Sequence, residues 1–254
     1  MTTTKKNTEP ELAPATISEH DGVRYLHLGT PWVQGAMNLK KPAALELEYI
    51  QRMMAWMLLR PAGELARGHA VQLGLGAGAI TRFTQGVMKM KTTVVELNPT
   101  VIGVNRAFFR LPAEGARFRV LEMDAQHYVD EVAEPGSADV LCVDLYDHEA
   151  ASPVLDSEAF YRGCARLLAE GGVMSVNLFG RDASFVRSAR RIAAAFEGGT
   201  VISLQPTREG NTVVLALKHG DVPEREELVQ RAQQIDTRYG LPARKWLRMI
   251  RPLP

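Results

Sequence analysis

Apolar runs alternate with amphipathic segments through most of the chain, from about residue 69 to residue 218. Helix-like segments lie between the runs; the clearest are residues 157–169 and 183–195, and Pro99 is well placed to open another helix. The apolar runs predict strands over residues 69–75, 92–97, 117–122, 138–144 and 173–179. Strands that alternate with helices predict an α/β fold, in which a doubly wound and mostly parallel sheet has helices on both faces.

The last part of this pattern differs from the rest. Residues 200–205 and 211–218 are strand-like, but they lie too close together for a crossover helix between them. We therefore expect the sheet to end in an antiparallel strand. Residues 223–238 follow as a charged amphipathic segment, which predicts a C-terminal helix.

The N-terminal residues are expected to form a separate small part. Its polar, proline-bearing start predicts a disordered tail. Residues 23–28 and 32–37 flank a Gly-Thr-Pro turn and predict a β-hairpin, and a helix is expected over residues 43–59. Pro61 and Gly63 then break the chain. The resulting divisions are a tail, a hairpin-plus-helix part and a ligand-binding domain with a C-terminal helix, over residues 1–18, 19–62 and 63–254.

The composition argues against several classes of function. Hydrophobic residues make up 46% of the 254 residues, and the formal net charge of +1 provides no basic field for nucleic acid or acidic membrane. Cys142 and Cys164 form no CxxC motif, which favours a reducing compartment, and the histidines lack metal-ligand spacing. The N-terminus lacks the apolar core of a signal peptide, and no apolar stretch could cross a bilayer. We expect a cytoplasmic protein without a metal, nucleic acid or membrane partner.

A glycine-rich stretch, LGLGAGAI, follows the first strand of the alternating region and opens a helix. Gly74, Gly76 and Gly78 allow a tight turn and let the backbone approach a ligand closely. The spacing from Gly74 to Ala79 also fits a dinucleotide fingerprint, and an ordinary strand–helix turn can have the same composition. The glycines alone do not separate these possibilities.

Acidic residues close three successive strands at the edge where such sheets bind ligands. Glu96 ends the second strand, and its carboxylate can accept both hydroxyls of an adenosine ribose in NAD or in an S-adenosyl ligand. Asp124 and Ala125 follow the third strand, where the acid can bind an adenine amino group or cap a helix. Asp144 closes the fourth strand. Three such acids favour an S-adenosyl site over NAD, whose enzymes need a second domain, although loop caps and solvated charges remain the simpler alternatives.

A second carboxylate, Asp147, lies three residues after Asp144 in the stretch VDLYD, beside Tyr146. An amine with a pKa of about 10, like lysine, cannot attack while it is protonated, so it needs an aligned base. One carboxylate can take that proton while the other holds a distal ammonium. The aromatic faces of Tyr146, Tyr49 or Trp32 can add cation–π attraction. The pair therefore suits a cationic amine that faces a cationic donor.

The order of these motifs resembles that of the spermidine synthase family, the polyamine aminopropyltransferases. The glycine loop is followed by VVELNP, MDA, VDLYD and FYRGCARLLAEGGVMSVNL, and VDLYD is similar to the family's D-x-x-D element. SEAFYRGC looks like its L-x-x-x-F-Y segment, and the N-terminal hairpin with its Tyr-bearing helix looks like a shortened version of the family's. The resemblance covers about residues 23–218 and implies a class I methyltransferase-like Rossmann fold.

The resemblance also implies an activity, a partner and a set of roles. The family moves an aminopropyl group from decarboxylated S-adenosylmethionine to an amine, and its members are often dimeric. Asp144 would be the general base, with Asp147, Tyr49, Tyr146 and Gln51 holding the amine. The residues expected to bind the S-adenosyl donor are Gln34, Gly74, Gly76, Gly78, Glu96 at the ribose, Leu97, and Asp124 with Ala125 at the adenine.

The sequence departs from the family pattern at positions that are expected to contact the tail of the donor and the acceptor. The family's glycine loop usually carries an acid that contacts the ammonium of the donor, and Ala77 stands in its place here. The family's Tyr-Gln-Glu appears as Tyr49, Ile50 and Gln51, and the N-terminal part is short. We therefore predict a weakened preference for the decarboxylated donor over intact S-adenosylmethionine. An S-adenosylmethionine-dependent methyltransferase and a non-catalytic nucleoside-binding relative remain the alternatives.

Overall fold

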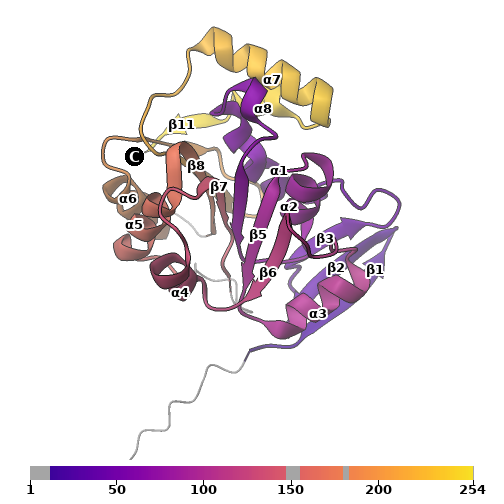
Figure 1. The fold of residues 1–254 in the computed structure, drawn as a ribbon. Coiled ribbons are helices and arrows are strands. Elements are labelled where there is room, and N and C mark those ends of the chain that lie inside the picture. The colour runs from indigo at the N-terminus through magenta and orange to yellow at the C-terminus, as the bar shows by residue number, and fades with distance from the viewer. Residues whose placement is uncertain (1–11, 147–154, 180–182, 254) are drawn as a thin grey trace, which may run out of the picture.

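An eight-stranded sheet forms the centre of the protein (Figure 1). The computed structural model describes residues 12–146, 155–179 and 183–253. The order of the strands across the sheet is β11-β9-β10-β8-β7-β4-β5-β6. In chain order they span β4 His69–Leu73, β5 Lys91–Glu96, β6 Phe118–Glu122, β7 Ala138–Val143, β8 Leu168–Phe179, β9 Thr200–Leu204, β10 Asn211–Leu217 and β11 Ile250–Pro252.

Strand pairing confirms the predicted mostly parallel sheet. Strands β6, β5, β4, β7 and β8 pair in parallel, whereas β10 pairs antiparallel with both β8 and β9. The antiparallel arrangement expected for residues 200–205 and 211–218 is therefore confirmed. Strand β4 lies between β5 and β7, so the strand order reverses at β4. The segments that leave the carboxyl ends of these three strands consequently meet at one edge of the sheet.

Helices cover both faces of this sheet (Figure 1). The helices that follow the N-terminal part are α2 Ala79–Thr81, α3 Pro99–Phe108, α4 Ala125–His127, α5 Glu158–Leu167, α6 Ala183–Ala195, α7 Arg225–Tyr239 and α8 Ala243–Trp246. Alternate residues of β4 enter different cores: Ala70 packs in the cluster that includes α7, and Val71 and Leu73 pack in the cluster that includes α5. This is the period of two that a strand buried on both faces requires.

The N-terminal part is a three-stranded antiparallel sheet, larger than the predicted hairpin. Its strands are β1 Ala15–His20, β2 Val23–Leu28 and β3 Gly35–Asn38. The expectation of a disordered tail through residue 18 is wrong for residues 15–18, which pair with β2. Apart from Ala15, β1 exposes its residues to solvent, so it lacks the apolar alternation that marks a half-buried strand.

The helix expected over residues 43–59 is shorter in the structure. Helix α1 spans Glu48–Met53, and a 3₁₀ segment, η1, continues over Met54–Leu58. Every residue of η1 is fully buried, so its composition is uniformly apolar and carries no helical period. Strand β8 begins at Leu168, inside the end of the helix that was expected over residues 157–169.

Candidate active site

A cavity of about 1070 Å³ opens at the carboxyl ends of β4, β5 and β7. The predicted site residues on its wall are Gln34, Tyr49, Gly74, Gly76, Glu96, Leu97, Asp124, Ala125, Asp144 and Tyr146. Gln51 is not on this wall, and its Nε2 donates a hydrogen bond to the Leu45 carbonyl at 2.7 Å. Gly78 caps α2 away from the wall. Asp147 lies outside the described residues.

The glycine loop needs its glycines for two separate reasons. Gly74, Gly76 and Gly78 have φ angles of 87°, 52° and 68°, in the left-handed region that favours glycine. A Cβ at Gly74 would lie 2.2 Å from the carbonyl oxygen of Asp144, so only glycine lets the ends of β4 and β7 approach this closely. The loop that was predicted to contact the donor is therefore in direct contact with the backbone of Asp144.

Buried side chains hold the carbonyl groups of this loop. The pairs are Gln72 Nε2 to Gly74 O at 2.7 Å, Asn105 Nδ2 to Gly76 O at 2.7 Å, and Arg82 Nη1 to Ala77 O at 2.5 Å. Arg82 also donates to the carbonyls of Pro42 and Phe109, at 2.7 and 2.9 Å. Burial lowers the pKa of Arg82 to about 10. One guanidinium thus ties the loop to two other segments of the chain.

Glu96 reaches across from β5 to the same loop. Its Oε2 accepts a hydrogen bond from the Leu75 amide at 2.8 Å, and its Oε1 accepts one from the Asn98 amide at 2.8 Å. Burial raises the pKa of Glu96, and these amide hydrogen bonds oppose the shift because they favour the ionised form. Each carboxylate oxygen has a further lone pair, so the group can still accept hydrogen bonds on the cavity side.

Asp124 caps α4, as one of the two readings of the sequence predicted. Its Oδ1 accepts a hydrogen bond from the His127 amide at 3.0 Å, and Ala125 opens the helix as a buried residue on the cavity wall. Leu97, at the carboxyl end of β5, is 42% exposed. These residues combine one acid with an apolar surface at the ends of β5 and β6.

Asp144 follows the last residue of β7 and lines the cavity. Its Oδ1 accepts a hydrogen bond from Asn177 Nδ2 at 2.9 Å, and the Tyr49 hydroxyl donates another to the carboxylate. Burial raises the pKa of Asp144 from 3.8 to about 6, and the two hydrogen bonds oppose that shift. The carboxylate is therefore positioned as a proton acceptor that works near neutral pH.

Asn177 is a site residue that the sequence reasoning missed. It belongs to β8, is 4% exposed, and lines the cavity. Its Oδ1 is buried and has no hydrogen-bond partner in the described part of the chain. Tyr146 fixes this strand end, because its hydroxyl donates to the Asn177 carbonyl at 3.0 Å and accepts from the Phe179 amide. The one sequence signal for Asn177 was a polar residue inside an apolar strand.

The cavity wall is strongly acidic. The described lining residues include six carboxylates but no lysine, arginine or histidine, although the whole chain has a net charge of +1. The carboxylates belong to Glu46, Glu48, Glu96, Asp124, Asp144 and Glu209. Three of these acids, Glu46, Glu48 and Glu209, were not singled out from the sequence. A cavity with this charge attracts cations.

A side pocket beside Asp144 is narrow. Its volume is about 10 Å³, roughly the space of one water molecule. Ala77, which is 3% exposed, lines it, and a Cβ added at Gly35 would lie 2.6 Å from the Ala77 Cβ. Asp144 is the only carboxylate among the described residues that line this pocket.

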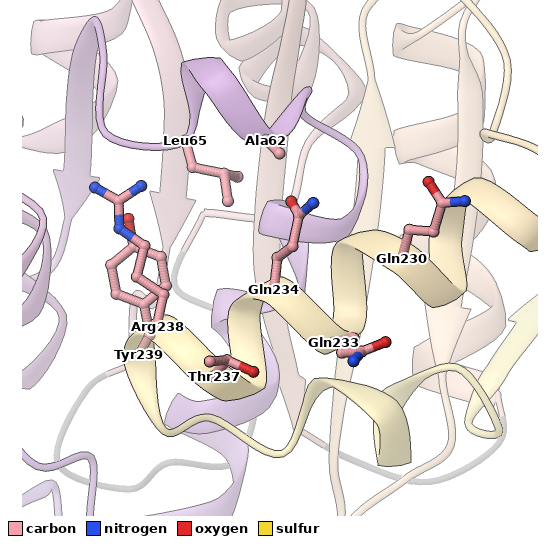
Figure 2. Close-up of a pocket in the computed structure, with 8 residues that line it drawn as sticks. All are labelled: Ala62, Leu65, Gln230, Gln233, Gln234, Thr237, Arg238 and Tyr239. Carbon is pink, nitrogen blue, oxygen red and sulfur yellow. The ribbon is translucent and has the colours of Figure 1, made fainter.

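A second hollow of about 580 Å³ lies between α7 and residues 62–65 and contains none of the predicted site residues. Figure 2 shows Gln234 extending from α7 toward the segment that carries Ala62 and Leu65. Among residues 12–146, 155–179 and 183–253, no cluster of three or more metal-binding side chains is found. No helix in those same ranges is both long enough and apolar enough to span a membrane.

Comparisons with known proteins agree with these features. A family model described as the spermine/spermidine synthase domain matches residues 74–206. The chain is 34% identical to a polyamine aminopropyltransferase of Neisseria meningitidis serogroup A over 227 residues, which cover 89% of this chain and 84% of the relative. It is 35% identical to the polyamine aminopropyltransferase of Chromobacterium violaceum, with the same coverage.

Solved structures share the fold at lower identity. A probable spermidine synthase from Corynebacterium glutamicum superposes with a TM-score of 0.73 at 22% identity, over 92% of this chain and 88% of that one. A spermidine synthase in complex with the transition-state analogue AdoDATO gives 0.59 at 17%, over 89% and 78%. Human methyltransferase-like protein 13 in complex with SAH gives 0.66 at 22%, over 75% and 91%. Together with the family model and the curated relatives, these matches confirm the sequence resemblance: the chain belongs to the spermine/spermidine synthase family.

Proposed function

We propose that the protein transfers an aminopropyl group from decarboxylated S-adenosylmethionine to an amine acceptor. The observation that carries this proposal is Asp144, a partly buried carboxylate with a raised pKa that lies between the glycine loop and Asn177. The curated relatives at 34% and 35% identity are polyamine aminopropyltransferases, which supports the same reaction. The second product would be methylthioadenosine.

The described residues fit an S-adenosyl donor. Gly74 and Gly76 lie on the cavity wall without side chains, so a ligand can approach the loop backbone closely. We assign Glu96 to the ribose hydroxyls, and Asp124 with Ala125 to the adenine. Leu97 offers an apolar surface beside them. A bound sulfonium donor supplies an electrophilic carbon next to a positively charged sulfur.

Asp144 would act as the general base. An amine with a pKa of about 10 arrives protonated, and Asp144 accepts that proton so that the nitrogen lone pair becomes available. The lone pair then forms the new C–N bond while the C–S bond breaks with its electrons onto sulfur. Asn177 Oδ1 is suited to accept a second N–H of the amine and so align it. Tyr49 holds the carboxylate of Asp144 in place.

The charge of the cavity suits this reaction. Both reactants are cationic, and the six carboxylates on the wall offset the repulsion between them. The same carboxylates would repel an anionic pyrophosphate such as that of NAD. This charge distribution supports a sulfonium donor over a dinucleotide.

The test is product analysis after incubation with each donor and an amine. Decarboxylated S-adenosylmethionine with 1,4-diaminobutane should release methylthioadenosine, and Asp144→Asn should release far less. Conversion of intact S-adenosylmethionine to S-adenosylhomocysteine would instead establish a methyltransferase, the candidate that the neutral side chain of Ala77 favours. Binding of methylthioadenosine without turnover of either donor would indicate the non-catalytic relative.

The remaining expectations concern assembly and location. A homodimer is implied by the family resemblance, a cytoplasmic location was expected from the composition and the N-terminal sequence, and both stay predictions. Light scattering of the purified protein tests the first, and cell fractionation tests the second.

A further inference from the structure

We propose that the hollow between α7 and residues 62–65, the α7 hollow, is a second ligand site that takes a small organic oxyanion, a carboxylate or phosphate ester with an apolar body. Its volume of about 580 Å³ is in the usual range for a small-molecule site. None of its described lining residues lines the cavity that contains Asp144. The inference is therefore independent of the proposed transfer reaction.

The charge of the α7 hollow is opposite to that of the cavity around Asp144. Arg238 is the only charged side chain among the described residues on its wall. Arg238 is exposed and forms no ion pair with an acid in the described part of the chain. The nearest acid in sequence, Asp236, is held by Arg244, whose Nε donates to the Asp236 carboxylate at 2.6 Å. The charge of Arg238 is therefore available to an anion.

One acid does occur on the segment opposite α7. Glu64 lies between Ala62 and Leu65 in sequence, but its side chain is not part of the described wall. Its carboxylate lies 4.0 Å from the guanidinium of Arg60, which is 5% exposed. The guanidinium of Arg60 offsets this charge, so the field inside the α7 hollow is set by Arg238.

Tyr239 restrains the guanidinium of Arg238. The carbon at the centre of that guanidinium lies 5.2 Å from the centroid of the Tyr239 ring, which is within the range of a cation–π contact. The same ring packs against Phe83 with a centroid separation of 6.0 Å, and Phe83 belongs to the buried apolar core. A guanidinium that is already held in place loses less conformational freedom when it binds a ligand.

The hydroxyl of Tyr239 independently indicates an acceptor on the ligand. Its oxygen is buried and has no hydrogen-bond partner among the described residues. A buried hydroxyl without a partner is costly, and a phenol can donate its proton to an oxygen of a ligand. The guanidinium and the phenol are both donors on the wall of one hollow. They favour a group that only accepts hydrogen bonds, as an ionised carboxylate or phosphate does.

The rest of the wall suits a small apolar body. Gln230, Gln234 and Arg238 follow at four-residue intervals, so they lie on one side of α7. Figure 2 shows them extending from the side of α7 that faces Ala62 and Leu65. Leu65 is 2% exposed and adds an apolar surface, while the two glutamines add amide donors. The α7 hollow thus combines one cation, neutral donors and an apolar surface.

The experiment is fluorine NMR of three probes with the full-length protein. The probes are 4-fluorobenzoate, 4-fluorophenyl phosphate and the neutral 4-fluorobenzamide. Titrations give the Kd of each probe for wild type, Arg238→Glu and Tyr239→Phe. Arg225→Glu is the matched control, because Arg225 is an exposed arginine of the same helix that does not line the α7 hollow. Thermal unfolding checks that each variant is folded, and Tyr239→Phe should keep the Tm of wild type because the hydroxyl that it removes has no partner in the described residues.

Wild type should bind at least one of the two anions in the low millimolar range, about five- to twentyfold more tightly than the amide. The tighter of the two anions identifies the ligand as a carboxylate or as a phosphate ester. Arg238→Glu should raise the Kd of that anion about tenfold or more, and Tyr239→Phe should raise it about two- to fivefold. Arg225→Glu should bind it as wild type does. Equal affinity of wild type for the anions and the amide, no anion binding at all, or anion binding that Arg238→Glu leaves intact would overturn the inference.

Discussion

Asn177 donates a hydrogen bond from Nδ2 to Oδ1 of Asp144 at 2.9 Å, while its own buried Oδ1 has no partner in the described part of the chain. One amide therefore stabilises the ionised carboxylate and leaves an acceptor next to it. Because Tyr146 fixes the backbone of this strand end, the orientation of the amide is constrained. Strand β8 thus places a polar side chain on the cavity wall beside the carboxylate that follows β7.

Asn177→Ala should shift the pH dependence of the rate. Its hydrogen bond lowers the pKa of Asp144, so its loss should raise that pKa and move the rising limb of kcat/KM to higher pH. We expect a loss of about tenfold or more at pH 6 and a smaller loss at pH 9, where the base is ionised in both proteins. A loss that is the same at every pH would mean that Asn177 does not act through Asp144.

Asp144→Asn should remove the base while the donor site stays intact. We expect turnover to fall by about 10²–10⁴-fold, because the amide cannot accept the ammonium proton. The affinity for methylthioadenosine, measured by calorimetry, should stay close to that of wild type. If turnover with every accepted amine is unchanged, Asp144 has no part in the proton transfer.

The same substitution should stabilise the unliganded protein at alkaline pH. The folded-state pKa of Asp144 is raised from 3.8 to about 6, so the native state holds a proton that the unfolded state has lost between these values. The free energy of unfolding therefore falls as pH rises from about 4 to 6, by up to about 1–3 kcal/mol after allowance for solvent in the cavity. Thermal unfolding at pH 8 should give a higher Tm for Asp144→Asn than for wild type, and the difference should vanish near pH 4. A lower Tm for the variant at pH 8 would contradict this account.

Glu96→Ala should weaken the binding of methylthioadenosine. We expect a loss of about 1.5–3 kcal/mol, the usual range for hydrogen bonds to a charged group. Glu96→Gln tests the charge separately, because the alanine variant also leaves the amides of Leu75 and Asn98 without their acceptor. Glu122→Ala is the control, since Glu122 pairs with Glu96 across β5 and β6 but is exposed and away from the cavity wall. Binding of NAD in preference to adenosyl thioethers would refute the donor assignment.

Ala77→Asp should favour the decarboxylated donor. A carboxylate at this position would attract the ammonium of that donor and repel the carboxylate of intact S-adenosylmethionine, by roughly 1–3 kcal/mol or one to two decades in relative affinity. Paired titrations with both donors measure the shift. Ala77→Asn separates charge from the strain of a larger side chain against Gly35. A wild type that already prefers the decarboxylated form by several decades would contradict the premise.

Much of the sheet could be predicted because most of its strands are buried on both faces and therefore read as apolar runs. Strands β4, β5, β7 and β8 and the antiparallel pair β9 and β10 follow from this signal, with shifts mostly at their ends. Strand β6 lies at the edge of the sheet and exposes Arg119 and Glu122, so its apolar signal is interrupted. Strand β1 could not be predicted this way, because most of its residues face solvent and its partners come from β2. Uniform burial likewise hid the change from α1 to η1.

The site residues also differ in whether local sequence could predict them. Glu96, Asp124 and Asp144 could be predicted because each ends a recognisable strand, and adjacent parallel strands bring their ends together. Asn177 could not, since its position beside Asp144 depends on the pairing of β8 with β7 rather than on local sequence, and Glu209 lies in the turn between β9 and β10, far from the motifs in sequence. Gln51 was expected to bind the amine, but its side chain donates a hydrogen bond to the backbone carbonyl of Leu45.

The close contact between Gly74 and the Asp144 carbonyl has an evolutionary consequence. Any side chain at position 74 would have to displace the backbone that carries Asp144, since a Cβ there would lie 2.2 Å from the carbonyl oxygen. Descendants of this protein can therefore vary the donor loop at position 74 only by also moving the carboxylate. The two positions should therefore be inherited as one unit.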